Sequence, residues 1–323
     1  MFNSIIQDDF VGKFLYSTAD IASCDDGIQL SILMDSRMEG WIGIPHGGIS
    51  MGIFADLAMA LENIAIHETG HYPVTVDYRL AGAGLKVNDV LDFHISKSAD
   101  GVQGEASVGS NPLPYMSATI RYGEKNEAQK DLFSSYLPSN VDQVLDRMIL
   151  LPFYRKCFVC GTERDYPGLR RQFHLWDTNG KIVVSFAGFD EKYKDSFYSF
   201  HRGHFLHPLP TAALLDETLG WAGFMRTAAG AVTVQISMTY YRPVSINEKL
   251  IFFGRGERVR GNPKGRLLYW ASGGAAAVQG DGSLEVVASA SGQWFAVHEL
   301  TEQMKTALLP EELMVRAFEL AKV

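Results

Sequence analysis

Two segments of the chain combine a histidine, a turn and an apolar stretch that carries an acid. Residues 45–57 read PHGGISMGIFADL, and residues 206–218 read LHPLPTAALLDET. A glycine turn at a helix start presents unpaired backbone N–H groups that favour negative charge. A carboxylate in an apolar helix has a raised pKa, which makes it a better base. Together these features suit an attack of water on a carbonyl carbon, in which an oxyanion must be held.

The two segments differ at the turn. Gly47 follows His46, whereas Pro208 follows His207. Proline has no N–H, so the second turn cannot donate a hydrogen bond from that position. We therefore expect only Gly47 to polarise a carbonyl group.

The two segments also differ in the acid. The second has Asp216 nine residues after its histidine, followed by Glu217. The first has Ala55 at the ninth position, and Asp56 comes one residue later. Because one residue turns a helix by about 100°, Asp56 should not point where Asp216 does. Asp216 and Glu217 are candidate catalytic acids, and Asp56 is interpreted as a displaced, structural acid.

Both segments belong to an internal repeat. The two histidines are 161 residues apart, the sequence VTV at 74–76 recurs at 232–234, and ND at 88–89 recurs as NE at 247–248, at offsets of 158 and 159. Three landmarks in one order and nearly one register indicate a duplication.

Each copy has the pattern of one helix followed by four strands. Segments 49–66 and 211–225 are apolar on almost every face, as expected of helices that are buried all round. Strand-like stretches follow at 73–80, 87–96, 102–109 and 114–122, and again at 231–241, 248–259, 266–277 and 284–296. This pattern predicts an α+β unit whose antiparallel sheet wraps a central helix.

These patterns divide the chain into four parts. We expect a first unit at 1–122, a charged linker at 123–152, a second unit at 153–299 and a C-terminal helix at 300–323. Pro310, followed by two glutamates, suits a helix start in the last part.

Composition limits the setting in which the protein acts. The 323 residues are 46% hydrophobic and 20% charged, as in soluble proteins of about two domains. A net charge of −8 argues against nucleic-acid binding, and no apolar run reaches the roughly 18 residues of a membrane span. The absence of a signal-peptide pattern and the presence of only three cysteines predict a cytoplasmic protein.

The combined motifs resemble the hotdog-fold acyl-CoA thioesterases of the 4-hydroxybenzoyl-CoA and phenylacetyl-CoA thioesterase types. The resemblance rests on the His-Gly-Gly turn, the acid two and a half turns later, the VTV strand and the YYRPV strand end at 240–244. The sequence CFVCGTERDYPGL at 157–169 is also similar to an opening found in some members. The resemblance covers roughly residues 20–122 and 155–298, and it implies a double hotdog in which two fused units pair like the subunits of a hotdog dimer.

In that family the active site lies between paired units, with the glycine turn from one and the acid from the other. The resemblance therefore implies one complete site, made by Gly47 and Asp216. It implies a second, incomplete site in which Pro208 faces Ala55 and Asp56.

Further roles follow from the resemblance. Thr233 aligns with a hydroxyl used near the base, where it would orient the attacking water. His46 and Gly48 flank Gly47 and are candidate substrate-binding residues. Members vary in a polar side chain six residues before the histidine, and this position is Gly40 here, so that oxyanion donor is missing. The sequence leaves open whether Asp216 activates water or attacks the carbonyl directly.

A basic stretch at 255–266 offers a candidate phosphate site. Arg258, Arg260 and Lys264 would suit the phosphates of coenzyme A, although a solvated hairpin explains the same residues. The thioester partner could be acyl-CoA or an acyl-carrier protein, and two chains could form a homodimer.

Two motifs have the spacing of metal ligands. Cys157 and Cys160 form a CxxC, and three histidines lie in HRGHFLH at 201–207. Neither motif has a second cysteine or histidine pair, or a nearby acid, to complete the coordination. We therefore expect no metal and no cofactor.

Two other functions remain compatible with the sequence. A non-catalytic acyl-thioester binding or sensing protein would keep the pocket and lose part of the chemistry. An enoyl-thioester hydratase or dehydratase would need a histidine and an acid on one unit for proton transfer at carbon, and neither copy shows that pair clearly. The leading hypothesis is a thioester hydrolase with one site between its two units.

Overall fold

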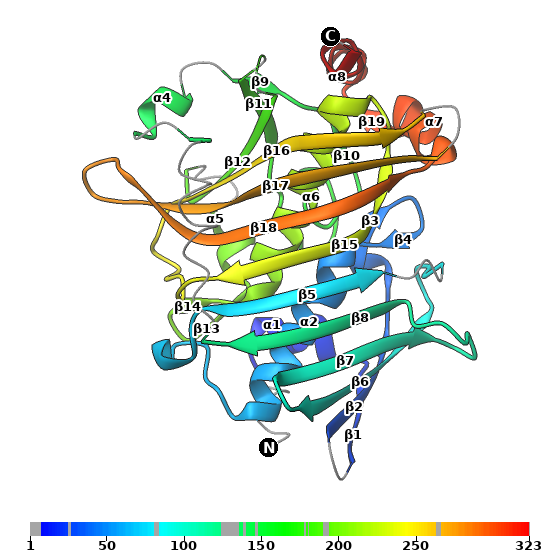
Figure 1. Ribbon diagram of the computed structural model, residues 1–323, viewed down its shortest axis with the longest axis vertical. Coiled ribbons are helices and arrows are strands. Elements are labelled where there is room, and N and C mark those ends of the chain that lie inside the picture. Colours follow the sequence, from blue (N-terminus) through cyan, green and yellow to red (C-terminus); the bar gives the residue numbers. More distant parts are fainter. Residues whose placement is uncertain are drawn as a thin grey trace.

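One antiparallel sheet runs through the computed structural model (Figure 1). The structure describes residues 8–322 except 25–26, 81–83, 124–135, 138–139, 146–147, 178, 180, 190–193 and 263–265. Its 13 strands lie in the order β1 (Asp20–Cys24), β2 (Gly27–Leu33), β6 (Val90–Ser98), β7 (Gly101–Val108), β8 (Met116–Tyr122), β5 (Val74–Leu80), β15 (Ala231–Tyr240), β18 (Leu284–Ala296), β17 (Leu267–Val278), β16 (Leu250–Gly261), β12 (Ile182–Ala187), β11 (Phe173–Asp177) and β9 (Ile149–Leu150). The first six strands come from the first copy of the repeat and the others from the second.

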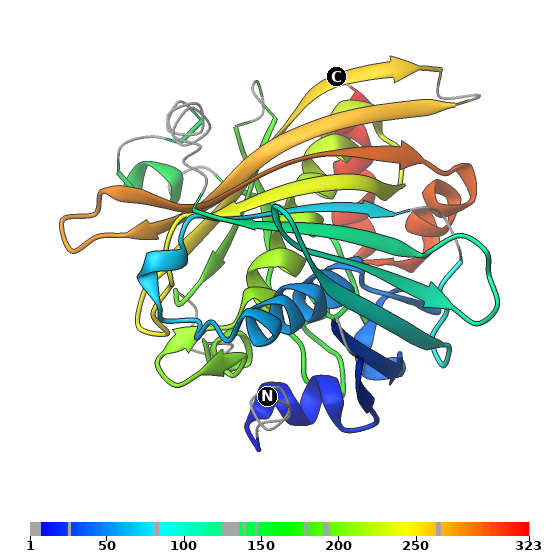
Figure 2. The ribbon, with the colours of Figure 1, turned by 60° about the horizontal axis from the view of Figure 1, so that its bottom comes forward.

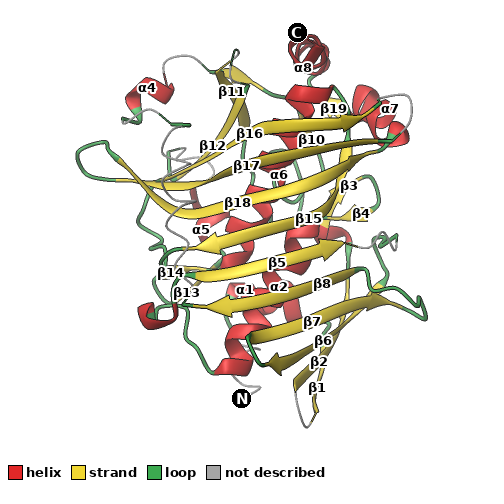
Figure 3. Cartoon of the chain, in the orientation of Figure 1, coloured by secondary structure: helices red, strands yellow, loops and turns green. Residues whose placement is uncertain are grey.

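Two long helices lie on one face of this sheet, and the sheet curves over them (Figures 1 and 2). They are α2 (Gly47–Glu62) and α6 (Pro208–Thr227), and most of their residues are buried. The shorter helices are α1 (Phe10–Tyr16), α4 (Asp142–Leu145), α5 (Lys194–Tyr198), α7 (His298–Ala307) and α8 (Glu311–Lys322). Three small ladders complete the described elements, namely β3 (Glu39–Trp41) with β4 (Ile44–Pro45), β10 (Phe153–Tyr154) with β19 (Leu308–Leu309), and β13 (His201–Arg202) with β14 (Phe205–Leu206) (Figure 3).

The predicted central helices and the eight predicted strands are all present, with ends shifted by a few residues. The sequence patterns missed the hairpin β1–β2 and the strands β11 and β12, which widen the two halves of the sheet. The C-terminal segment forms two helices rather than one, because the chain runs as the short strand β19 between α7 and α8. Strand β9 lies inside the expected linker and pairs with β11 of the second half. Within the described residues, no helix has both the length and the apolar character needed to cross a membrane.

The two halves of the sheet are joined by one strand pair. β5 pairs with β15 in an antiparallel register that runs from Val74 opposite Tyr240 to Arg79 opposite Gln235. The hydroxyls of Thr75 and Thr239 lie 3.0 Å apart within this pair. Since the same strand of each copy forms the junction, the two units are related by a pseudo-two-fold axis.

The central helices cross in close contact. A Cβ atom built at Gly48 would lie 2.2 Å from the Cα atom of Ala213, and one built at Gly52 would lie 2.5 Å from Cβ of Leu209. Real Cβ atoms do not approach so closely, so α2 and α6 can cross here only because Gly48 and Gly52 have no side chain. This contact fixes the position of the N-terminus of each helix beside the middle of the other.

Substitutions at two neighbouring glycines test this contact. Gly48→Ala should lower the free energy of unfolding by about 1–3 kcal/mol or more, because its methyl group would meet backbone atoms of α6 that cannot rotate away. The control is Gly47→Ala, whose methyl group would meet its nearest neighbour at 3.6 Å, an ordinary contact. Urea unfolding of both variants measures the difference, and equal stabilities would show that the helices do not depend on this crossing.

Candidate active site

A cavity of about 650 Å³ lies between the two units. Residues of the first unit line one end of it, among them Trp41, His46, Gly47, Leu80, Leu85 and Tyr115. Residues of the second unit line the rest, among them Asp216, Gly220, Phe224, Thr233, Tyr269, Trp294 and Met304. The structure therefore brings Gly47 and Asp216, which are 169 residues apart in sequence, to one cavity.

The two predicted reactive groups are close neighbours. A Cβ atom built at Gly47 would lie 3.6 Å from Oδ2 of Asp216. The other carboxylate oxygen, Oδ1, accepts a hydrogen bond of 2.7 Å from the hydroxyl of Thr233. Thr233 thus holds the carboxylate in one orientation, with Oδ2 turned toward the start of α2.

The surroundings of Asp216 favour its protonated form relative to a carboxylate in water. Burial raises the pKa of Asp216, and the nearby Glu217 adds to this rise. His46 and the Thr233 hydrogen bond act in the opposite direction without reversing it. A carboxylate of raised pKa takes up a proton more readily and is a stronger general base.

His46 caps α2 and faces Glu217. Its Nδ1 accepts a hydrogen bond of 3.0 Å from the N–H of Gly48, and its Nε2 lies 3.3 Å from Oε2 of Glu217. The same Oε2 accepts a hydrogen bond of 3.2 Å from the thiol of Cys157. Because Nδ1 acts as an acceptor, the proton of a neutral ring sits on Nε2 and points at Glu217. His46, Cys157 and Glu217 lie within 4.8 Å of one another, but this tautomer leaves no lone pair on Nε2 for a metal.

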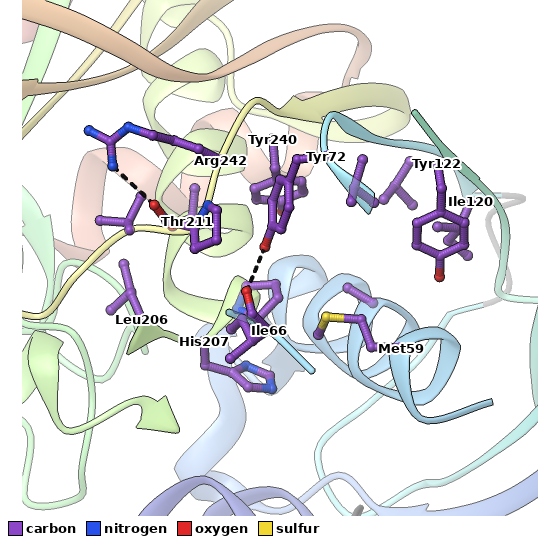
Figure 4. A pocket seen from close by; sticks show the side chains of 16 residues that line it. Met59, Ile66, Tyr72, Ile120, Tyr122, Leu206, His207, Thr211, Tyr240 and Arg242 are labelled. Carbon is purple, nitrogen blue, oxygen red and sulfur yellow. Dashed lines mark hydrogen bonds between the residues drawn. The ribbon is translucent and has the colours of Figure 1, made fainter. Parts of the chain in front are cut away.

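The pseudo-two-fold copy of this cavity has almost closed. Its remnant measures about 40 Å³ and is lined by Pro208, Ala55, Val74 and Val76, the counterparts of Gly47, Asp216, Val232 and Val234. The aromatic side chains of Tyr72, Tyr122 and Tyr240 and the side chain of Met59 are among the residues that occupy the walls (Figure 4). The second site therefore lacks the amide, the acid and the space for a substrate.

Asp56 lies outside this remnant, in a buried ion network. The guanidinium of Arg202 donates hydrogen bonds to both of its carboxylate oxygens, and the hydroxyl of Tyr16 donates one of 2.6 Å. Nε2 of His207 lies 3.2 Å from Oδ1 of Asp56. Burial would raise the pKa of Asp56, but His207 and Arg202 outweigh it and lower the pKa to about 2. These contacts hold the Asp56 carboxylate among charged and polar partners of both units.

The interpretation of Asp56 as a displaced copy of Asp216 is wrong, however. His207 caps α6 through Nδ1 and faces Asp56, in the same way that His46 caps α2 and faces Glu217. Asp56 and Glu217 stand ten residues after their own histidines, so Asp56 is the counterpart of Glu217. The counterpart of Asp216 is Ala55.

Two glycines of the first turn have packing roles. Gly48 does not line the cavity; its Cα faces Ala213, and its N–H is bonded to His46. A Cβ atom built at Gly40 would lie 2.7 Å from Cα and Cβ of His46. Gly40 is therefore required for the close approach of the β3–β4 hairpin to the cap, which is why no polar side chain can stand there. The geometry gives no support to substrate binding by Gly48.

Neither Arg258 nor Arg260 lines the cavity. The guanidinium of Arg258 lies 3.9 Å from the ring centroid of Trp270, which faces a groove on the sheet surface opposite the helices. Arg260 lies two residues further along β16 and is exposed. Lys264 lies outside the described residues. Binding of coenzyme A phosphates by these side chains stays a prediction without geometric support.

Several residues of the site belong to no recognisable sequence motif and were not predicted. Tyr115 precedes β8 and lines the cavity, and burial together with the charge of Asp216 raises its pKa well above the ordinary value. Met304 lines the cavity from α7, the helix that follows β18. Arg202 lies five residues before His207, and only its burial beside Asp56 reveals its role.

Comparisons with known proteins were made for sequence and structure. No protein-family model matches the sequence, and no curated protein matches it either. A solved structure of a putative thioesterase from Novosphingobium aromaticivorans has 11% identity and a TM-score of 0.49, covering 86% of this chain and 98% of its own. A tesB protein from Mycobacterium avium subspecies paratuberculosis has 11% identity and a TM-score of 0.48, covering 86% and 96%. The dehydratase domain from the CurK module of curacin polyketide synthase has 13% identity and a TM-score of 0.48, covering 87% and 96%.

Removal of the charge should have different effects on stability at the two buried aspartates. Asp56→Asn should lower the free energy of unfolding by about 3 kcal/mol or more, because buried Arg202 loses the carboxylate charge that pairs with its guanidinium. Asp216→Asn should leave stability unchanged or raise it, since an amide can still accept the Thr233 hydrogen bond and a buried charge is removed. Chemical denaturation compares the two variants with the wild type, and a larger loss in Asp216→Asn would contradict these assignments.

Proposed function

We propose that the protein is a double-hotdog acyl-CoA thioesterase that hydrolyses its substrate at the single site made by Gly47 and Asp216. The observation that supports this best is their juxtaposition across the two units, with 3.6 Å between a Cβ position at Gly47 and Oδ2 of Asp216. An amide at a helix start and a buried carboxylate of raised pKa are the two groups that thioester hydrolysis requires.

The start of α2 binds the carbonyl oxygen of the thioester. The N–H of Gly48 bonds to Nδ1 of His46, and the N–H of Ile49 bonds to the His46 carbonyl. In the described structure, the N–H of Gly47 has no such acceptor, and Gly47 lines the cavity. Placed there, the thioester oxygen accepts this hydrogen bond and lies at the positive end of a 16-residue helix. Both effects grow as the oxygen becomes an oxyanion, so they favour the transition state over the substrate.

Asp216 promotes the attack on the carbonyl carbon. As a general base, it takes a proton from water while the water oxygen bonds to that carbon. The tetrahedral oxyanion then collapses, the C–S bond breaks, and the proton on Asp216 passes to the leaving thiolate. In the alternative route, Oδ2 itself attacks the carbonyl carbon, the C–S bond breaks and the thiolate leaves, so that a mixed anhydride remains. Water then hydrolyses the anhydride, which restores the Asp216 carboxylate, releases the acyl group as an acid and provides the proton for the thiolate. In either route the Thr233 hydroxyl fixes Oδ1 and leaves Oδ2 directed at the substrate.

The histidine geometry favours hydrolysis over an enoyl-thioester hydratase or dehydratase. Those reactions transfer a proton to or from carbon, a step for which a histidine nitrogen is the usual acid or base. Both nitrogens of His46 are engaged, Nδ1 by the Gly48 N–H and Nε2–H by Glu217. We assign His46 and Glu217 to positioning the turn, because the equivalent pair His207 and Asp56 persists in the copy that lacks a substrate cavity.

The thiols beside the site suit a reducing compartment. Cys157 and Cys160 are both free and buried, and their thiols interact with each other and with Glu217. Thiols in such proximity persist where glutathione and thioredoxin keep cysteines reduced, as in the cytoplasm.

Thiol release from a panel of acyl-CoA thioesters tests the proposed activity. Asp216→Asn should lower kcat/KM by about 10³-fold or more, as expected when a general base or nucleophile is lost. Thr233→Val should cause a smaller loss of about tenfold, because the carboxylate stays but turns more freely. The matched control is Thr75→Val, the same change at the equivalent position of the other unit, which should keep wild-type activity.

Three results would argue against the proposal. Full activity in Asp216→Asn would remove the acid from the mechanism. Consumption of enoyl-CoA without thiol release would favour the hydratase. Tight acyl-CoA binding with no thiol release from any thioester, whether on coenzyme A or on an acyl-carrier protein, would favour a sensing protein.

A further inference from the structure

We infer that the acyl group of the substrate is an apolar chain of about eight to ten carbons, bound along the face of α6 that carries Asp216, Gly220 and Phe224. Gly220 keeps this acyl channel open, and Phe224 closes its inner end. The inference rests on the proposed function, because it takes the reacting carbonyl to lie between Gly47 and Asp216.

The residues that line the cavity differ in exposure. Ile44 and Val232 are 42% and 46% exposed, whereas Phe224, Met304 and Leu308 are buried. Asp216, Gly220 and Phe224 line the cavity along α6. A substrate whose thioester lies at Asp216 therefore places one substituent beside Gly220 and Phe224. The inner walls are apolar, which identifies that substituent as the acyl group rather than the phosphorylated coenzyme.

The length of the channel follows from helix geometry. Asp216, Gly220 and Phe224 are spaced by four residues and lie one above another on the same helix face. Eight residues of α-helix rise by about 12 Å. An extended backbone residue contains three bonds and spans roughly 3.5 Å, so an extended chain advances by about 1.2 Å per bond. About ten bonds therefore separate the carbonyl carbon from Phe224, or slightly fewer because the phenyl ring leans back along the helix.

Gly220 is the feature that marks this channel. α2 and α6 contain three and two glycines, and only Gly220 among these five has nothing within 4 Å of an ideal Cβ position. Gly48, Gly52 and Gly223 are explained by packing; a Cβ at Gly223 would lie 1.8 Å from the ring of Tyr269. Glycine inside a helix costs about 1 kcal/mol relative to alanine. No neighbouring atom requires a glycine at position 220. We therefore infer that Gly220 is kept because a side chain there would fill the space beside the helix.

The floor and walls of the channel are rigid. The ring of Phe224 packs edge-on against Trp221 at 5.4 Å and against Phe318 of α8 at 4.9 Å. One wall is the stacked pair Tyr269 and Trp294, with 8° between the ring planes. Rings braced in this way do not yield to a longer chain, so the channel should discriminate by length.

Helix α7 forms the remaining wall and is fixed in place. A Cβ atom built at Gly230 would lie 2.7 Å from the sulfur of Met304, which shows how closely α7 docks on the strand that follows α6. The indole N–H of Trp41 donates a hydrogen bond of 2.9 Å to Gln303 and ties α7 to the β3–β4 hairpin.

Binding of S-alkyl-CoA thioethers of increasing length tests the channel without requiring hydrolysis. For the wild type, affinity should rise about fourfold for each methylene, the expected gain for burial of one such group, and should level off near eight to ten carbons. In Gly220→Leu the new side chain lies about one turn, or roughly 5 Å, beyond Asp216, so the plateau should move to about four carbons. Affinity for the ten-carbon thioether should then fall by more than tenfold.

Two further variants make the test specific. Arg226→Leu adds the same side chain to an exposed position of α6 that does not line the cavity, and its length profile should match the wild type. Phe224→Leu shortens the floor, so its plateau should move to longer chains. Gly220→Ala should raise the melting temperature, because it replaces a helical glycine that no contact requires.

The outcomes separate the two proposals. If no acyl-CoA is hydrolysed but the thioether plateau shifts between wild type and Gly220→Leu, the proposed function fails and the acyl channel stands. If thioesters are hydrolysed but Gly220→Leu leaves the plateau unchanged, or weakens thioethers of every length equally, the acyl channel is refuted. If the wild-type affinity does not rise with chain length at all, the inner cavity does not bind the acyl group.

Discussion

The close contact between α2 and α6 is the constraint on which the site depends. Gly48 meets Ala213, and by the pseudo-two-fold relation Gly52 meets Leu209. Gly47 precedes Gly48 by one residue and Asp216 follows Ala213 by three, so the contact places an amide at one helix start beside an acid on the other helix. The same relation places Pro208 beside Ala55. One packing contact thus creates two equivalent positions for chemistry, and side chains decide which of them is used.

The two positions differ in their acids and in the partners of those acids. Both keep a histidine that caps its helix and faces an acid of the other unit. At the closed position the acid Asp56 is ionised, bonded to Arg202 and remote from any substrate space. At the open position Asp216 is buried with a hydroxyl as its hydrogen-bond partner. Burial of a carboxylate costs stability, and such a cost is typical of groups that are retained for function.

Much of the fold could be predicted because its signals are local or periodic. The apolar helices, the eight central strands and the repeat all follow from patterns within single segments. The pairing of Gly47 with Asp216 needed the family resemblance, since no local pattern relates residues 169 apart. The assignment of Asp56 failed because Asp56 was matched with Asp216, although Asp56 and Glu217 both stand ten residues after their histidines. The direction of Arg258 was not predictable, because β16 contains a register shift between Gly256 and Arg258 that turns the following side chains. The wall supplied by α7 could not be foreseen either, because its residues show only an amphipathic helix.

The central claim is that the Gly47 N–H polarises the thioester, and Gly47→Pro tests it most directly. Proline removes the N–H and is favoured at the first position of a helix, where Pro208 already stands in the second unit. His46 has the extended backbone that a following proline requires, and the ring has ordinary space beside Asp216. The measurement is kcat for acyl-CoA hydrolysis together with the affinity for an S-alkyl-CoA thioether. The account predicts a fall in kcat of about 10²–10³-fold with little change in thioether affinity and folding stability. Wild-type kcat in a folded Gly47→Pro protein would contradict it.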